Sequence, residues 1–248
     1  MIIKSIIVSV AIIFILTFEI FFPKEKIKFK DKITRISKNI FFWLVNIGIT
    51  PIIILPITIY ATQFEIHSLF KFDNLIISFL FHLIIVDIFL YWWHRLNHEI
   101  PFLWRFHHVH HLDETLDISS GVRFHFGEVI FSALVRSLLI ILFNISLVNL
   151  LLIEAVILIS SIFHHSNINL PKKLEKALSF IIVTPSIHWV HHHKRQSETD
   201  ANYSTIFSWW DKIFNSKSNF TRKVGMPIGV QGDREQNLLN LILRPIKK

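Results

Sequence analysis

Four stretches of the chain are long and apolar enough to be buried in a lipid bilayer. Three of them, residues 5–22, 41–60 and 75–93, each carry at most one acidic or basic side chain. Because about 20 apolar residues cross a hydrocarbon layer of about 30 Å, each stretch is predicted to be a membrane helix. The fourth, residues 129–165, is too long for one crossing and turns polar between Asn144 and Asn149, which predicts two helices in a tight hairpin. We therefore expect an all-α polytopic membrane protein with four or five membrane helices.

Basic residues directly after the first apolar stretch predict the orientation of the chain. They are Lys24, Lys26, Lys28, Lys30, Lys32, Arg35 and Lys38. Short loops rich in Lys and Arg stay in the cytoplasm, so the loop at residues 63–73 is expected outside. Residues 94–128 and 166–248, here called the cap, are expected to form a cytosolic, helical, histidine-rich region. No small-residue cleavage site follows the first stretch, which favours an uncleaved anchor over a signal peptide.

Composition narrows the classes of function. The net charge of +8 is explained by the Lys and Arg residues on the expected cytoplasmic side, where they also attract anionic lipid. The basic residues do not alternate with exposed aromatic residues as they do on a nucleic-acid-binding surface, so no nucleic-acid partner is expected. The chain has no cysteine, which excludes thiolate ligands, iron–sulfur clusters and disulfides.

Histidines are gathered into three short clusters. The first is an H-x3-H pair and the other two are H-x2-H-H runs, which together comprise His94, His98, His107, His110, His111, His188, His191 and His192. On a helix, residues three or four apart share a face, so each cluster can direct its imidazoles at one point. Neutral imidazole binds iron, zinc and copper. Eight ligands exceed what one ion uses, so the spacing predicts two metal ions at a membrane face.

Other polar residues have competing interpretations. His67 and His82 are interpreted as ordinary hydrogen-bonded histidines, and His108 and His193 as neighbours of ligands that fill space. Asp87 lies two helical turns before His94 and within the membrane, where a carboxylate is costly. We expect Asp87 to accept a hydrogen bond from the ring of a ligating histidine. The alternative is an ion pair with Arg136. Glu154 is a weaker candidate for a similar role.

These residues resemble the fatty acid hydroxylase/sterol desaturase superfamily of integral-membrane, non-haem di-iron oxygenases. The resemblance covers about half the chain and rests on an ordered set of motifs. They are Asp87 with YWWHRLNH at 91–98, LWRFHHVHH at 103–111, RFHFGE at 123–128, FHHSN at 163–167, TPSIHWVHH at 184–192, DANY at 200–203 and WDKIF at 210–214. Two positions depart from the family pattern: Phe126 stands where proline is usual and Trp189 where arginine is frequent.

The resemblance implies more than the spacing does. It implies two non-haem iron ions, with zinc as a possible substitute after purification, dioxygen as co-substrate and a membrane lipid as substrate. It adds His125 and His165 to the ligands and suggests that Asp200 and Asn202 close the site, with Asp87 and Asn202 as residues that support the ligands. The corresponding domains are residues 1–84 as membrane anchor, 85–216 as the di-metal domain and 217–248 as a tail.

The resemblance implies that the protein is an O2-dependent hydroxylase or desaturase of a sterol, fatty acyl or related chain. The sequence carries no flavin fingerprint and no cysteine, so electrons are expected from a separate ferredoxin or cytochrome with its reductase. Two other classes stay open. A zinc-dependent membrane hydrolase would carry H-E-x-x-H, which is absent because Glu99 follows His98 without a second histidine at that offset. The other is a metal transporter or a binding protein without chemistry. A transport site is expected near the bilayer midplane on broken helices, whereas these clusters are predicted to lie beyond the helix ends.

Overall fold

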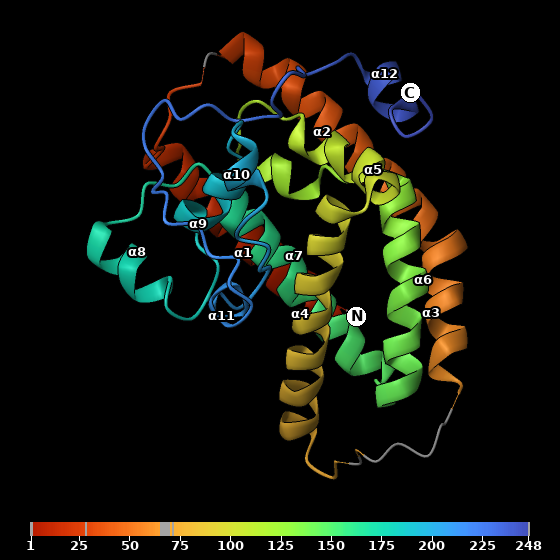
Figure 1. Cartoon of the computed structure of the whole chain (residues 1–248). Coiled ribbons are helices and arrows are strands. Elements are labelled where there is room, and N and C mark those ends of the chain that lie inside the picture. Colours follow the sequence, from red (N-terminus) through yellow and green to blue (C-terminus); the bar gives the residue numbers. More distant parts are fainter. Residues whose placement is uncertain (1, 28, 65–69, 71, 248) are drawn as a thin grey trace.

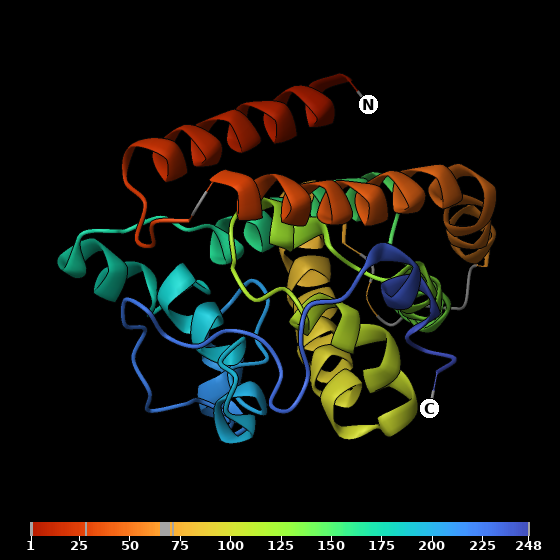
Figure 2. The ribbon, with the colours of Figure 1, turned by 90° about the horizontal axis from the view of Figure 1, so that it is seen from above.

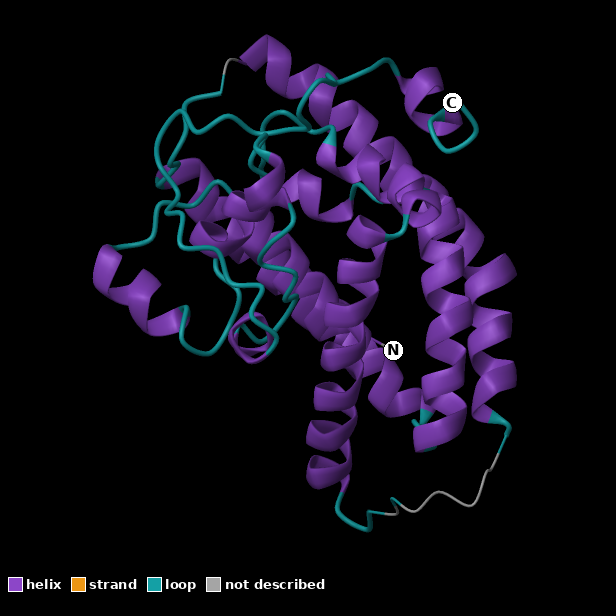
Figure 3. Ribbon diagram, viewed as in Figure 1, coloured by secondary structure: helices purple, strands orange, loops and turns teal. Residues whose placement is uncertain are grey.

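The computed structural model describes residues 2–27, 29–64, 70 and 72–247. Within these residues the secondary structure is helical, and extended pairing is limited to isolated bridges (Figure 3). The predicted all-α fold is therefore confirmed.

Among the described residues, four helices are long and apolar enough to span a membrane, in agreement with an integral membrane protein. They are Lys32–Thr62, α4 (Leu75–Glu99), α6 (Phe126–Phe143) and α7 (Leu147–His165). The N-terminal helix α1 (Ile2–Phe21) has an apolar part, Ser5–Phe21, that is shorter than each of these four spans. It contacts α7. The four candidate spans agree with the predicted number of four or five membrane helices.

The first span is not a uniform helix. It consists of α2 (Phe29–Ile49), the π-helical turn η1 (Thr50–Ile54) and α3 (Leu55–Thr62). Pro51 lies inside the turn and has no N–H to donate to the preceding turn, so the hydrogen-bonding pattern widens there. As a result α3 leaves the direction of α2 and runs beside α6 (Figure 1).

The two predicted helices are present as α6 and α7, but they diverge from their connecting turn and do not pack along each other as a tight hairpin (Figure 1). Asn144 ends α6 in the left-handed conformation, with φ at 49°, which asparagine tolerates better than most residues. Ser146 then caps α7 by accepting the backbone N–H of Asn149 with its side chain. The polar interruption between 144 and 149 therefore comprises the turn at residues 144–146 and the first residues of α7.

Helix α4 continues beyond the predicted end at residue 93. Asn74 caps its start and accepts the N–H groups of Ile76 and Ile77. The helix ends at Glu99 because Ile100 precedes Pro101 and takes an extended conformation. His94 and His98 consequently lie on the last turns of α4. This end is opposite the connection between α3 and α4 (Figure 1); His67 and Lys71 in that connection lie outside the described residues.

Short helices build the cap around this end of α4. They are α5 (Pro101–His111), η2 (Ile118–Val122), α8 (Lys172–Leu178), α9 (Pro185–His191), α10 (Gln196–Thr199), α11 (Trp209–Ile213) and α12 (Leu238–Leu243). Seen from above, α1 and α2 run along one side of the molecule and most of the cap lies on the other (Figure 2).

A buried ionic network joins the cap to α2. The Arg35 guanidinium donates to the carboxylates of Asp113 and Asp117, and its bond to Asp113 is 3.0 Å long. Ser120 also donates to Asp113, at 2.7 Å. Burial alone would raise the pKa of Asp113, but attraction to Arg35 and Arg123 lowers it overall. The network therefore holds charged partners together and fixes the loop after α5 against α2.

The C-terminal segment packs onto the same region. Glu235 accepts two hydrogen bonds from Arg123, at 2.7 and 3.2 Å. Leu241 of α12 is buried in an apolar cluster with Phe42, Val109 and Leu112. Residues 217–248 thus help to cover α5, the helix that carries one histidine cluster.

Candidate metal centre

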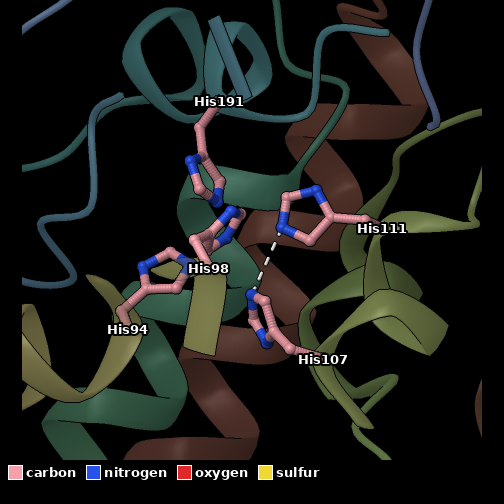
Figure 4. A group of neighbouring side chains, drawn as sticks. All are labelled: His94, His98, His107, His111 and His191. Carbon is pink, nitrogen blue, oxygen red and sulfur yellow. Dashed lines mark hydrogen bonds between the residues drawn. The ribbon is translucent and has the colours of Figure 1, made fainter. Parts of the chain in front are cut away.

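Among the described residues, nine histidines from four segments of the chain converge in two groups. The first group is His94, His98, His107, His111 and His191, and the second is His110, His165, His188 and His192. Within each group one nitrogen of every ring lies within 4.8 Å of the others. Figure 4 shows the rings of the first group directed at a common centre from α4, α5 and α9. All eight clustered histidines singled out by spacing fall into these groups, together with His165.

Hydrogen bonds fix the tautomers of the second group. Nδ1 of His110 lies 3.1 Å from the Arg123 carbonyl, and Nδ1 of His165 lies 2.7 Å from the Ser161 carbonyl. A carbonyl can only accept, so in both rings the proton is on Nδ1 and Nε2 carries a lone pair. Yet these two Nε2 atoms lie 3.0 Å apart. Two lone pairs at that distance repel each other unless a cation lies between them.

The first group is oriented in the same way. Nδ1 of His94 donates to the Tyr203 carbonyl at 2.8 Å, and Nδ1 of His191 donates to the Ala201 carbonyl at 2.7 Å. Nδ1 of His107 donates to the Glu128 carboxylate at 2.9 Å. Each bond leaves Nε2 free to act as a ligand, and such outer partners are typical of metal-binding histidines.

The spacing of the nitrogens fits a transition-metal ion. In the second group the Nε2 atoms of His165 and His188 lie 2.9 Å apart, and those of His188 and His192 lie 3.2 Å apart. Two nitrogens bound at about 2.0–2.1 Å with angles between 90° and tetrahedral are separated by about 2.9–3.4 Å. In the first group the Nε2 atoms of His107 and His111 lie 3.2 Å apart. The residues present therefore fit a metal ion in each group.

Burial keeps the rings in the form that binds metal. It lowers the pKa of His191 to about 3. Burial, with repulsion from neighbouring imidazoles, likewise lowers the pKa values of His110, His111, His188 and His192 well below the usual value. These histidines are consequently neutral near pH 7, and neutral imidazole is the ligand form.

His125, the tenth predicted ligand, lies apart from both groups. Its Nδ1 accepts the backbone N–H of Gly127 at the start of α6. Its Nε2 lies 3.1 Å from the Ile242 carbonyl. Both ring nitrogens thus have partners within the protein, and the residue links α6 to α12. Phe126, where the family usually has proline, follows it directly.

Asp87 has partners other than those expected. Its carboxylate accepts hydrogen bonds from the backbone N–H groups of Ile206 and Phe207, both at 3.0 Å, and from the Trp210 indole at 2.8 Å. Neither a histidine ring nor Arg136 is among these partners. Asp87 instead anchors the segment that includes Tyr203, whose carbonyl orients His94.

Asn202 and Asp200 border the first group. Asn202 adopts φ of 56°, and its side chain donates to the Ile187 carbonyl at 3.2 Å and accepts the Ser218 N–H at 3.0 Å. It therefore braces the loop that carries the Ala201 and Tyr203 carbonyls. An Asp200 oxygen lies 3.4 Å from Nδ1 of His98.

Glu128 and His164 were not selected from the sequence as site residues. Glu128 is buried and bonds His107 from the first turn of α6, 21 residues further along the chain. His164 is buried, with its ring centre 4.0 Å from that of His188. Both belong to motifs of the family resemblance, which is the signal that could have identified them.

A cavity of about 330 Å³ adjoins both histidine groups. His94, His107, His110, His165 and His188 line one part of it. The remainder lies between the spanning helices and is lined mainly by apolar side chains, including Trp43, Leu90, Trp93, Val129, Ile157 and Leu158. The cavity thus connects the histidines with the interior of the membrane-spanning region.

Comparison with known proteins agrees with this arrangement. A sequence profile described as fatty acid hydroxylase matches residues 79–216, which contain all nine converging histidines. No solved structure matches the chain significantly.

Three named proteins illustrate the similarity. An ornithine lipid hydroxylase of Rhizobium tropici is 29% identical over 77% of this chain and 57% of its own length. The alkylglycerol monooxygenase of Homo sapiens is 32% identical over 56% of this chain and 30% of its own length. The human cholesterol 25-hydroxylase is 26% identical over 55% of this chain and 50% of its own length. The chain therefore spans between about a third and somewhat over half of these relatives.

Proposed function

Because the chain belongs to the fatty acid hydroxylase family, we propose that it is a membrane-bound di-iron oxygenase that hydroxylates or desaturates a lipid. The observation that carries the proposal is the pair of converging histidine groups, in which Nδ1–H bonds to carbonyls leave lone pairs facing one another. Each group holds one iron ion, through five histidines in the first and four in the second. Zinc can replace the iron ions during purification.

The protein supplies geometry and a dry environment. Bound iron supplies the redox chemistry that reduces dioxygen for attack on an unactivated C–H bond. In hydroxylation the substrate C–H becomes C–OH and the second oxygen atom leaves as water, which requires two electrons and two protons from a donor. Three acceptors orient ligand rings: the Tyr203 carbonyl holds His94 and the Ala201 carbonyl holds His191. The Glu128 carboxylate holds His107. The apolar cavity walls orient the chain and exclude water.

The substrate reaches the site from the bilayer. We propose that an acyl or related chain of a membrane lipid enters the cavity between the spanning helices. The relatives, an ornithine lipid hydroxylase, an alkylglycerol monooxygenase and a cholesterol 25-hydroxylase by name, support this substrate class. The basic run after α1 favours a cytoplasmic position for the histidine groups. Electrons then come from a cytoplasmic ferredoxin or cytochrome with its reductase, since the sequence contains no cysteine for an iron–sulfur cluster of its own.

Lipid profiling tests the proposal. Membranes from cells with and without the protein are compared by mass spectrometry for a gain of one oxygen or a loss of two hydrogens. The same comparison with His94→Ala, His107→Ala, His110→Ala, His188→Ala or His191→Ala is expected to abolish the change while the protein still inserts into the membrane. Full oxidation in two of these variants would overturn the proposal. Turnover with two zinc ions and no oxygen requirement would support the hydrolase instead.

A further inference from the structure

Residues 172–182 and 207–213 of the cap form one unit, here called the lateral unit, which contains α8 and α11. Ser208 joins its two parts. The Ser208 N–H donates to the Ile181 carbonyl at 3.1 Å, and the Ser208 hydroxyl donates to the Ser179 carbonyl at 2.8 Å. The two parts therefore present a single surface.

The lateral unit exposes several large apolar side chains. Phe180 is 58% exposed and Ile181 56%, while Ile213 is 58% exposed and Leu174 46%. No residue of α8 is buried, and in Figure 1 and Figure 2 this helix lies at the periphery of the molecule. Exposed apolar side chains that lie close together mark a contact with a membrane or with another protein.

Cationic side chains flank these apolar ones. Three exposed lysines lie on α8 against one glutamate, and they are Lys172, Lys173 and Lys176. Because a helix turns by about 100° per residue, the three lysines share one side of α8 and Leu174 lies on the other. Lys212 of α11 is also exposed, and its Nζ lies 5.1 Å from the centre of the Phe180 ring. Lysines on one face and apolar side chains on the other are typical of an element that lies in the membrane interface.

Contacts with α4 place the lateral unit beside a spanning helix. Phe214, which directly follows α11, packs against Tyr91 and Trp92 of α4, with ring centres 5.0 Å apart in both pairs. Trp92 is itself exposed and lies seven residues before the end of α4 at Glu99, which is about 10 Å along the helix axis. Tryptophan near the end of a spanning helix is typical of the membrane–water interface. The lateral unit is therefore continuous with the lipid-facing surface of α4.

We propose that the lateral unit is a second membrane contact, which inserts Phe180, Ile181 and Ile213 into the bilayer surface and binds anionic lipid headgroups through its lysines. A lipid surface fits because the unit is both cationic and continuous with the lipid-facing part of α4. This contact lies outside the spanning helices and does not depend on the oxygenase function. It fixes the cap, and with it the histidine groups, against one leaflet.

Site-directed labelling tests the apolar part of the contact, because the chain has no cysteine and each introduced one is the only reactive thiol. Ile181→Cys is labelled with a fluorophore in protein reconstituted into nanodiscs of phosphatidylcholine, with or without anionic phosphatidylglycerol. Leu138→Cys, exposed on the spanning helix α6, is the control within the bilayer, and Ser197→Cys, exposed on α10, is the control in water. We expect the label at Ile181, like that at Leu138, to be quenched by lipids with brominated acyl chains and protected from aqueous iodide. The label at Ser197 should show the reverse.

Replacement of the lysines tests the headgroup part. Phosphatidylglycerol should increase quenching of the Ile181 label by brominated lipid, because anionic lipid attracts the lysines. Changing Lys172, Lys173 and Lys176 together to glutamine should abolish this increase. The matched control changes three exposed cations elsewhere in the cap to glutamine, namely Arg195, Lys223 and Arg234. It lowers the net charge equally and should leave the increase intact.

Each other outcome contradicts the proposal. An Ile181 label that iodide quenches in both kinds of disc would overturn the membrane contact. Protection from both quenchers only in discs that hold two copies of the protein would assign the surface to a second copy instead. An equal loss in the two triple variants would overturn specific binding of headgroups by the lateral unit. Lipid oxidation is measured separately, so its absence would count against the oxygenase proposal and leave the membrane contact standing.

Discussion

The Glu128 carboxylate lies 2.9 Å from Nδ1 of His107 and joins the first turn of α6 to the histidine cluster on α5. It is the carboxylate partner that fixes the orientation of a ligand ring in the first histidine group. The first turn of a membrane-spanning helix thus holds a ligand carried by the short helix α5.

Replacement of Glu128 tests this role. In Glu128→Ala, His107 loses its acceptor, and we expect iron affinity to fall by about 10–100-fold, as is typical when such partners are removed. In Glu128→Gln the amide oxygen can still accept the Nδ1–H, so the loss should be smaller. Iron retained against increasing chelator measures both. Equal losses in the two variants would mean that the hydrogen bond itself is unimportant.

The two histidine groups should be separable by metal content. His191→Ala removes a ligand from the five-histidine group and His188→Ala one from the four-histidine group. We expect each variant to lose most of one iron equivalent and keep most of the other, measured by elemental analysis of anaerobically purified protein. His125→Ala is the control, since its ring bonds Ile242 and Gly127 instead, and should retain both equivalents. Loss of one iron in His125→Ala would contradict the nine-histidine assignment.

The sequence predicted the histidine clusters because their spacing is local. Periodicity correctly indicated that histidines four residues apart face one point, as His107 and His111 do in one group and His188 and His192 in the other. The expectation that a whole cluster faces one point was wrong, because His110 and His191 each belong to the opposite group. Periodicity could not predict which rings belong to which group. His110 and His111 are adjacent in sequence, yet the helical rotation between them directs one ring to each group.

The oxygens that orient the rings were harder to predict, because most of them are distant in sequence from the histidines. The Tyr203 carbonyl that accepts the His94 hydrogen bond is 109 residues away in the sequence. Every residue has a backbone carbonyl, so the sequence does not indicate which one orients a ring. Asp87 illustrates the consequence. Asp87 lies on the same helix face as His94 and two turns before it, which suggested a direct bond to a histidine ring. Instead, its carboxylate accepts hydrogen bonds from Ile206, Phe207 and Trp210.

The Arg35 network should contribute strongly to stability. Arg35→Met would leave Asp113 and Asp117 buried without their cation, and removal of one partner from a buried ion pair typically costs about 3–5 kcal/mol. We expect a marked fall in the thermal unfolding midpoint of the detergent-solubilised protein. Arg234→Met, at an exposed position, should change stability by less than about 0.5 kcal/mol. Similar midpoints for the two variants would show that the aspartates find other partners.

Asp87→Asn should weaken the metal centre through the backbone rather than through a ligand. One amide oxygen can still accept hydrogen bonds, but the amide nitrogen cannot accept the second set of bonds that the carboxylate receives from Phe207 and Trp210. The loop then loosens, and with it the Tyr203 carbonyl that holds His94. We expect iron occupancy to fall without being lost, and the first histidine group to be affected more than the second. Iron content of Asp87→Asn combined with His188→Ala decides this. If Asp87 serves the first group, the double variant retains clearly less iron than His188→Ala alone, whereas combination with His191→Ala adds little to the loss from His191→Ala alone. The reverse pattern would assign Asp87 to the second group.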